Sequence, residues 1–449
     1  MTFNTSKLFQ TISIIVFVVL LQSCETQQLE ITNISAHEKD GNVLRIEVLF
    51  EITQDAMVEI TYWSDQDTVR LRDSKKAGEN NFILIGLEPE EKYSFVLSTK
   101  NSNKEVETEL GVFKTNKLPD DFPVFDLVID SGNVFAGYLL LRYTKKPARQ
   151  IIINNKAHVV WYQDFDTTIF RPSTFTKEQT LLSIENTKLI KEYDLYGNIL
   201  FELHKGEKGF DKLIHHEIIK NKNNYLALTR EKQVFDLSEI GGGKADTVKS
   251  DGILVLDDDG NKVWEWSIFD VENPVADKNI LKMIGDWGHA NSLSIDENGN
   301  YLISFRLFDQ VWNIDAITGE VLWKLGLNGD FDMAENDYFF KQHAAHINAD
   351  GDLMLFDNGN IFNPISRSLS FNIDNENRKL SLKTKVILPD SLHTFKMGSA
   401  YLIPENKFLI CASTKQKVLV TNNKSDILWM LDCNRITYRT QYIKALYLN

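Results

Sequence analysis

The chain has 449 residues, of which 43% are hydrophobic and 25% are charged, and its formal net charge is −14. This length and composition are typical of an ordered protein with one large and one small domain, each with its own core. The sequence contains no long run of lysine and arginine, which argues against a nucleic-acid groove because such a groove needs a concentrated basic face. Any anion-binding site must therefore be local.

The first 24 residues have the pattern of an export signal. Lys7 is followed by an apolar run over residues 12–21, which is too short and too close to the N-terminus for a membrane span. Its end, Leu-Leu-Gln-Ser-Cys over residues 20–24, resembles the bacterial lipoprotein signal, in which cleavage leaves the cysteine at the new N-terminus for lipidation. We therefore expect a lipid anchor on Cys24 and a place in the bacterial cell envelope, at the outer membrane facing the periplasm or at the cell surface. The alternative is an ordinary cleaved signal with a chance cysteine.

The chain contains three cysteines. Lipidation of Cys24 leaves Cys411 and Cys433, which can form a disulfide in an oxidising compartment. Both lie in apolar stretches, so two buried free thiols are an equal alternative.

Residues 25–118 are expected to form a small β-sandwich. Short alternating runs separated by polar turns cover residues 44–52, 57–63, 82–87, 93–99 and 108–115. The segment 84–95, which contains Tyr93, resembles the tyrosine-corner region of fibronectin type III domains. Pro119 and the acidic pair after it mark the boundary. No catalytic constellation appears here, so we expect a spacer or interface role.

Residues 119–449 are expected to form a six-bladed β-propeller, which makes the whole chain all-β. An Asp or Asn, a polar turn and then an aromatic residue recur along this part, with Trp161, Trp264, Trp323 and Trp429 as aromatic members. Six such units give about 55 residues each, close to the length of a four-stranded blade. The tryptophans are expected to pack between blades.

Three histidines each open the same module of strand, polar turn and strand. They are His216 with its turn at 221–224, His289 with its turn at 298–300, and His343 with its turn at 350–352. A fourth copy over residues 397–403 lacks the histidine. Because radially stacked repeats bring one module position together in space, the three imidazoles are expected to share one pocket. His215 is adjacent to His216, and the turn spacing does not decide which of the two points inward.

Polar residues near strand ends accompany these histidines. Arg306 follows the strand 302–305, and Asn291 and Asn358 are further candidates that either orient an imidazole or contact the substrate. An arginine with several imidazoles makes a compact site for a tetrahedral or planar anion, because guanidinium donates two parallel hydrogen bonds. Three histidines also suit zinc, but the charge of Arg306 would repel a cation, so no metal is expected.

At these residues the sequence resembles the arylsulfate sulfotransferases, bacterial propeller enzymes that move a sulfuryl group from one phenol to another without a nucleotide donor. The resemblance is strongest over 286–292 (Asp-Trp-Gly-His-Ala-Asn-Ser), 342–345 with 356–359, and 366–367 with 373–374. It runs from about residue 121 to the C-terminus, and an N-terminal sandwich domain also occurs in that family.

The resemblance implies a role for each candidate. His343 becomes the nucleophile that forms a sulfohistidine, His289 and Arg306 bind sulfuryl oxygens, and His216 serves as general acid and then base. Asn291 and Asn358 count among the substrate-binding candidates. Ping-pong kinetics, an aryl sulfate donor, a phenol acceptor and no cofactor follow from the same resemblance.

Two other functions compete with this interpretation. A lipoprotein propeller that binds a sulfated or phenolic ligand without chemistry would use the same pocket. Quinone-dependent dehydrogenases share the architecture, but their repeated tryptophan motif is unmatched in at least two units of this chain. A homodimer is left open, as is the natural donor and acceptor.

Overall fold

The computed structural model describes residues 28–65, 67–100, 105–143, 148–165 and 170–447. Cys24 and the predicted export signal lie outside these residues. Within the described part, no helix has the length and apolar character needed to cross a bilayer. Cys411 and Cys433 are free thiols, both buried, so the structure takes the second of the two alternatives.

The chain divides into two compact units. One consists of Met1–Ser35, Leu49–Asn81 and Ser94–Gly111, and the other of Ala36–Val48, Phe82–Tyr93 and Val112–Asn449. The division runs through strands of the N-terminal sheets, and the domain boundary expected after residue 118 stays a prediction.

The N-terminal region forms two sheets rather than helices, and along strands such as β3 (Ala56–Trp63) and β6 (Lys92–Lys100) buried residues alternate with more exposed ones. One has the order β1 (Ile31–Lys39), β2 (Asn42–Ile52) and β5 (Gly78–Leu84). The other has the order β4 (Thr68–Lys75), β3 (Ala56–Trp63), β6 (Lys92–Lys100) and β7 (Glu105–Glu107), and β8 (Gly111–Lys114) also pairs with β6. The backbone N–H of Glu88 donates to Tyr93 Oη at 2.9 Å.

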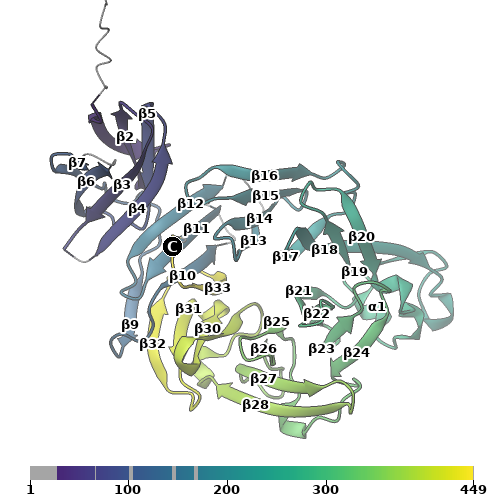
Figure 1. The fold of residues 1–449 in the computed structure, drawn as a ribbon. Coiled ribbons are helices and arrows are strands. Elements are labelled where there is room, and N and C mark those ends of the chain that lie inside the picture. The colour runs from purple at the N-terminus through teal and green to yellow at the C-terminus, as the bar shows by residue number, and fades with distance from the viewer. Residues whose placement is uncertain (1–27, 66, 101–104, 144–147, 166–169, 448–449) are drawn as a thin grey trace, which may run out of the picture. The chain divides into compact units, whose positions relative to one another are not determined.

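The rest of the described chain forms six antiparallel sheets, named sheets 1 to 6 below, in a propeller-like arrangement (Figure 1). Sheet 1 contains β33 (Thr437–Ile443), β10 (Tyr138–Tyr143), β11 (Ala148–Asn154) and β12 (Val159–Phe165). Sheet 2 contains β13 (Phe170–Phe175), β14 (Leu181–Glu185), β15 (Leu189–Tyr193) and β16 (Ile199–His204). Sheet 3 contains β17 (Ile214–Asn221), β18 (Asn224–Phe235), β19 (Asp246–Leu256) and β20 (Lys262–Ser267).

The three remaining sheets follow in chain order. Sheet 4 contains β21 (Ala290–Ile295), β22 (Tyr301–Phe305), β23 (Gln310–Ile314) and β24 (Val321–Gly326). Sheet 5 contains β25 (His343–Ile347), β26 (Leu353–Asp357), β27 (Arg367–Asp374) and β28 (Lys379–Ile387). Sheet 6 contains β29 (Ser399–Ile403), β30 (Lys407–Ala412), β31 (Lys417–Thr421), β32 (Ile427–Asp432) and β9 (Asp126–Asp130).

Helices are short. The one α-helix among the described residues is α1 (Ile280–Met283). The 3-10 turns are Ser238–Ile240, Ile268–Asp270, Pro274–Ala276, Glu335–Asp337, Asp390–Leu392, Pro404–Asn406 and Ser413–Lys415.

The two ends of this region close the ring of sheets. The C-terminal strand β33 pairs with β10 and is the first strand of sheet 1, while β9 pairs with β32 at the outer side of sheet 6. Middle strands such as β14, β22 and β26 are buried along their whole length, since each sheet is covered on both faces.

Tryptophans join neighbouring sheets in the same way at several places. The indole N–H of Trp161 donates to Leu195 O at 2.8 Å, and that of Trp429 donates to Asn155 O at 2.9 Å. In sheet 3, Trp266 makes the equivalent bond to Gly319 O at 2.9 Å. The spacing had pointed to Trp264, which lies on the same side of β20 and contacts Tyr301 with tilted rings whose centroids are 5.1 Å apart. Buried indoles thus connect an outer strand of one sheet with a turn of the next.

Candidate active site

Each histidine module opens with a β-bulge on the first strand of its sheet. The ladder register shifts between His215 and Ile218 in sheet 3, and equivalent shifts occur at the starts of β21 and β25. Left-handed backbone accompanies each bulge: φ is 53° at His216, 54° at His289 and 53° at Ala344. A bulge re-aims side chains that would otherwise alternate strictly between the two faces. The local backbone therefore sets the direction of these imidazoles.

His216 and His289 lie next to each other although they belong to different sheets. Their ring centroids are 5.2 Å apart, and Tyr438 from β33 lies 6.4 Å from the His216 ring. His215 is buried, with 2% exposure, and its ring centroid lies 4.9 Å from that of His216. His216 is therefore the member of the pair that faces His289.

His343 is buried and held by two oxygen atoms. Its Nδ1–H donates to Asn358 Oδ1 at 2.7 Å and to Lys341 O at 2.9 Å. Since Nδ1 carries the proton, the lone pair is on Nε2, which accepts a longer bond of 3.2 Å from the Met397 N–H. Burial, together with the charge of Arg439, lowers the pKa of His343 to about 3. The imidazole is therefore neutral near pH 7, as a nitrogen nucleophile must be.

The two asparagines hold the loops that carry the histidines. Asn358 donates to Thr394 O at 2.7 Å and to Met397 O at 2.9 Å while it accepts from His343, which fits the imidazole-orienting alternative. Asn291 donates to Gln342 O at 2.8 Å, and both asparagine side chains are fully buried. Asn291 Oδ1 has no hydrogen-bond partner among the described residues.

His289 has an acidic partner that the sequence reasoning did not assign to it. Its Nδ1 lies 2.5 Å from Asp286 Oδ2, and Arg230 Nη1 donates to Asp286 Oδ1 at 2.8 Å. Burial would raise the pKa of Asp286, but the hydrogen bond from His289 and the charge of Arg230 outweigh it and lower the pKa to about 2. Asp286 thus holds the imidazole of His289 in place through Nδ1. The signal was available, because Asp286 stands three residues before His289 in the motif that carries the family resemblance.

Arg306 follows β22, and its backbone N–H donates to His289 O at 3.1 Å. Within the described ranges its guanidinium makes no ion pair and no side-chain hydrogen bond, and burial lowers its pKa. Neighbouring arginines differ: Arg230 pairs with Asp251 and Asp286, Arg367 with Asp357, and Arg439 with Glu217. Of these four arginines, Arg306 is the one whose guanidinium N–H groups are not engaged by a carboxylate, so it can donate hydrogen bonds to an anion.

A channel cavity of about 160 Å³ lies along the first strands of the six sheets. Each strand contributes one lining residue or more: Thr174, Glu217, Ser292, Ala344, Tyr401 and Arg439 are among them. His346, three residues after His343 on β25, also lines this channel, and burial lowers its pKa to about 4.

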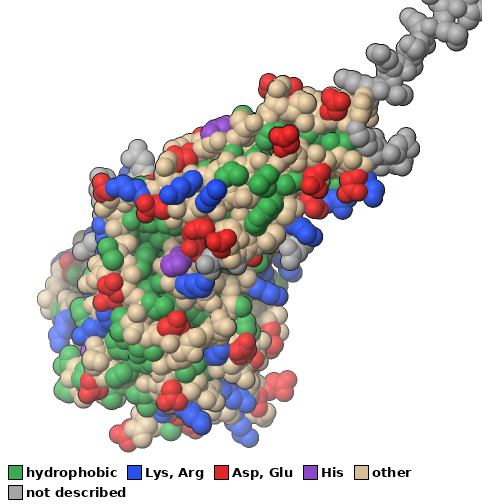
Figure 2. All heavy atoms as spheres, turned by 90° about the vertical axis from the view of Figure 1, so that its left-hand side faces the viewer, with side chains coloured by type: hydrophobic (Ala, Val, Ile, Leu, Met, Phe, Trp, Pro, Cys, Tyr) green, Lys and Arg blue, Asp and Glu red, His purple; other side chains and the backbone are tan. Residues whose placement is uncertain are grey.

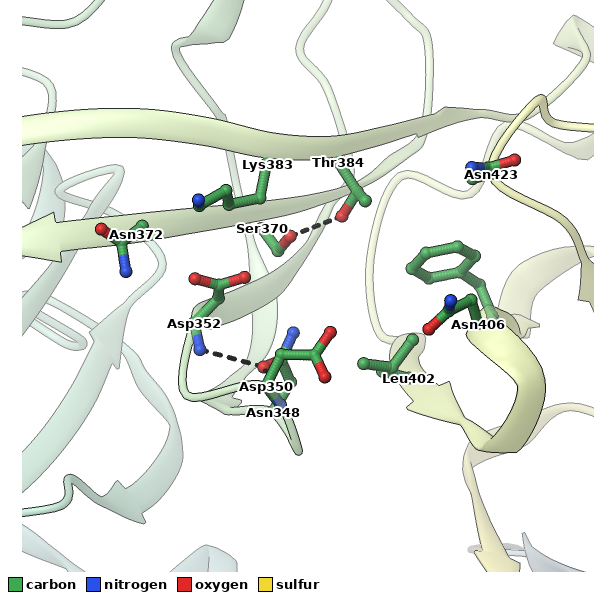
Figure 3. Close-up of a pocket in the computed structure, with 11 residues that line it drawn as sticks. Asn348, Asp350, Asp352, Ser370, Asn372, Lys383, Thr384, Leu402, Asn406 and Asn423 are labelled. Atoms are coloured by element: carbon green, nitrogen blue, oxygen red, sulfur yellow. Dashed lines mark hydrogen bonds between the residues drawn. The ribbon is translucent and has the colours of Figure 1, made fainter.

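A larger cavity, of about 450 Å³, lies between sheets 5 and 6 around the turn that follows β25 (Figure 3). Its lining includes Asp350, Asp352, Asn372 and Lys383 but no histidine or arginine. It therefore has none of the predicted site residues. No cluster of three His, Cys, Asp or Glu side chains that could hold a metal occurs among the described residues.

Acidic and basic side chains are interspersed on the face of the molecule in Figure 2. Arg306, whose guanidinium forms no ion pair among the described residues, is a local positive charge in a chain whose net charge is −14. An anion would be attracted by this nearby charge rather than by the surface as a whole.

Solved structures with some likeness to this chain are distant. A protein of unknown function from Bacteroides caccae is 13% identical with a TM-score of 0.43, and the match covers 68% of this chain and 98% of that one. A virginiamycin B lyase from Staphylococcus aureus is 10% identical with a TM-score of 0.36, over 68% of this chain and 88% of that one. An auxiliary nutrient binding protein from Bacteroides ovatus is 11% identical with a TM-score of 0.36, over 89% and 86%.

No curated protein matches the sequence. The family model for arylsulfotransferase (ASST), however, matches residues 96–385, which is more than half of the chain. These residues include all three histidine modules and Arg306. The chain therefore belongs to the arylsulfotransferase family.

Proposed function

We propose that this protein transfers a sulfuryl group from an aryl sulfate to a phenol through a sulfohistidine formed on His343. Family membership supports aryl sulfotransferase activity in general. The observation that carries the specific proposal is Arg306, a partly buried guanidinium without a carboxylate partner among the described residues, next to His289 and within the electrostatic reach of neutral His343.

In the first half-reaction, His343 Nε2 attacks sulfur, the S–N bond forms and the S–O bond to the aryl group breaks. The bond from the Met397 N–H to Nε2 has to give way first, and at 3.2 Å it is the weakest of the three that hold the ring. Arg306 and His289 donate to sulfuryl oxygens, where they stabilise the charge in the transition state. His216 donates its proton to the departing phenolate oxygen.

The second half-reaction runs in reverse with a new phenol. His216 takes the proton of the phenol hydroxyl, the phenol oxygen attacks sulfur, and the S–N bond breaks to restore neutral His343. Asn358 holds the Nδ1 proton of His343 throughout, so that the same nitrogen, Nε2, attacks and leaves. One pocket thus serves donor and acceptor in turn, and ping-pong kinetics follow.

The same proposal includes the architecture and the location of the enzyme. Sheets 1 to 6 act as the blades of a six-bladed propeller, preceded by a small sandwich that resembles fibronectin type III domains. A lipid on Cys24 anchors the enzyme at the outer membrane, facing the periplasm or the cell surface.

The test is the mass of the intact protein after mixing with p-nitrophenyl sulfate without an acceptor, quenched at neutral to alkaline pH. We expect a gain of one sulfuryl group that disappears when phenol is added. The variant His343→Asn should gain nothing, while His204→Asn, a change of an exposed histidine on β16, should gain the group like the wild type. Full labelling of His343→Asn would refute the proposal that His343 is the nucleophile.

A second candidate is a propeller that binds a sulfated or phenolic ligand without turnover. The bond from Met397 N–H to His343 Nε2 favours it, because a nitrogen engaged in this way is not a free nucleophile. A binding protein would be stabilised against heat by p-nitrophenyl sulfate, yet neither an adduct nor p-nitrophenol would form.

A further inference from the structure

We propose that Asp251, His215 and His216 form a proton relay in which His215 is the positioning residue for the general acid and base. This inference rests on the proposed sulfuryl transfer and adds a role for two buried residues that the transfer itself does not use. It is carried by a continuous row of contacts from Asp251 on β19 through His215 to His216, which lies next to His289.

Asp251 is the buried end of the row. Its side chain is fully buried, and Oδ1 lies 3.0 Å from His215 Nε2. Oδ1 also accepts from Arg230 Nη1 at 3.1 Å, and Oδ2 accepts from the Ala290 N–H at 2.6 Å. These bonds fix the carboxylate beside His215, and because Ala290 follows His289, they also connect it to the loop of the second histidine.

The contacts of His215 determine where its protons are. Nε2 faces two acceptors, Asp251 Oδ1 at 3.0 Å and Thr229 O at 3.1 Å, so Nε2 must carry hydrogen. Nδ1 lies 2.6 Å from His216 Nδ1, a distance that requires one shared proton between the two nitrogens. When both rings are neutral, that proton belongs to His216 Nδ1, which leaves the lone pair of His216 on Nε2.

The pair therefore has two states that differ by one proton on His216 Nε2. With that proton, the pair has one positive charge, and the shared proton can move to His215 so that the charge lies beside Asp251. When His216 Nε2 gives its proton to the leaving phenolate, the shared proton stays on His216 Nδ1 and the pair becomes neutral. The acceptor phenol returns the proton to Nε2, and the cycle closes without a net change.

The surrounding charges set the balance between these states. Asp251 favours the charged pair, whereas Arg230, bonded to the same carboxylate, opposes it, and Asp286 lies beyond Arg230. Burial lowers the pKa of His215 against the opposing hydrogen bond from Asp251. The charged pair is the state that starts the cycle, and the neutral pair is the state at the sulfohistidine stage, before the acceptor phenol returns the proton.

The relay predicts a dependence on the leaving group. p-Nitrophenolate is a weak base that leaves without a proton, whereas the phenolate of phenyl sulfate needs general acid catalysis. For His215→Gln, which keeps a hydrogen-bonding side chain but cannot be charged, we expect adduct formation from phenyl sulfate to slow on the order of 100-fold, the low end for general acid catalysis. Adduct formation from p-nitrophenyl sulfate should stay within about threefold, because it needs no such acid.

The experiment measures the single-turnover rate of adduct formation by intact mass for both donors in the wild type, His215→Gln, Asp251→Asn and the control His204→Gln. Asp251→Asn keeps an oxygen for the Ala290 N–H and removes the charge, so it tests the relay if His215→Gln does not fold. Asp251→Asn should show the same selective loss with phenyl sulfate.

Each outcome has a separate meaning. Equal slowing with both donors, or no slowing in folded variants, would overturn the relay while wild-type labelling upholds sulfuryl transfer. Absence of any adduct in the wild type would overturn both. A selective loss with phenyl sulfate in His215→Gln and Asp251→Asn, with His204→Gln unchanged, supports the relay.

Discussion

At the scale of single residues, His343 combines the role proposed for it with a cost to stability in acid. Burial depresses its pKa from 6.5 to about 3 in the folded protein. Below pH 6.5 the unfolded chain therefore binds a proton that the folded protein does not, so the stabilisation present above pH 6.5 is lost as the pH falls towards 3. Between pH 7 and pH 5 this histidine alone should lower the free energy of unfolding by about 2 kcal/mol.

The comparison that checks this is urea unfolding at pH 7 and pH 5 for the wild type, His343→Asn and His204→Asn. His343→Asn should lose less stability over this interval than the wild type, whatever its stability at pH 7. Because His204 is exposed, His204→Asn should lose as much stability between pH 7 and pH 5 as the wild type does. Equal losses in all three proteins would mean that His343 is not buried in its neutral form.

The candidate site residues could be predicted from the sequence where the repeated strand-turn-strand module is visible. His216, His289 and His343 stand at one module position, and Arg306 ends the strand of the second module. The acidic partner Asp251 could not be predicted, because it reaches His215 only through the pairing of β17, β18 and β19. A contact that depends on pairing across two strands leaves no short-range sequence pattern from which it could be predicted.

At the scale of elements, the strands were predictable from turn spacing, but the bulges were not. Ala344 has φ of 53° directly after His343, while Ala345 is absent from the positive-φ positions, and both are 2% exposed. A methyl group in left-handed backbone costs about 1–2 kcal/mol, and glycine removes that cost. Nothing in the apolar pattern of residues 343–347 distinguishes these two alanines.

The two alanines make a matched pair for testing the bulge. Ala344→Gly and Ala345→Gly each remove one buried methyl group and each gain the same freedom in the unfolded chain. Only the first relieves strain, so Ala344→Gly should be more stable than Ala345→Gly by about 1–2 kcal/mol. Urea unfolding measures the difference, and equal stability would mean that the bulge at β25 stores no strain.

At the scale of the whole propeller-like region, the C-terminal strand does more than complete sheet 1. Arg439 of β33 forms an ion pair with Glu217 of β17 and donates to Asn291 O of β21 at 2.5 Å. Both side chains of the pair are buried, and Glu217 raises the pKa of Arg439 against the effect of burial. One side chain from the end of the chain therefore connects sheets 1, 3 and 4 across the channel.

Sequence analysis predicted a ring of six units but not this connection, because Arg439 lies outside every repeated motif. The ring closure by β33 and β9 was likewise invisible, since it pairs strands from opposite ends of the region. Long-range pairing of this kind is decided by which strand is left without a partner once the local sheets have formed.

A double-mutant cycle can separate the contribution of the Arg439–Glu217 ion pair to stability from that of the ring closure. Arg439→Met leaves Glu217 buried without its partner and should cost about 3–5 kcal/mol, whereas Arg439→Met with Glu217→Leu should recover a large part because no buried charge is then left alone. Thermal and urea unfolding of the wild type, both single variants and the double variant give the coupling energy. If the double variant is as unstable as the sum of the single changes, the pair does not hold the sheets together. In that case the closure depends on the strand pairing of β33 with β10 alone.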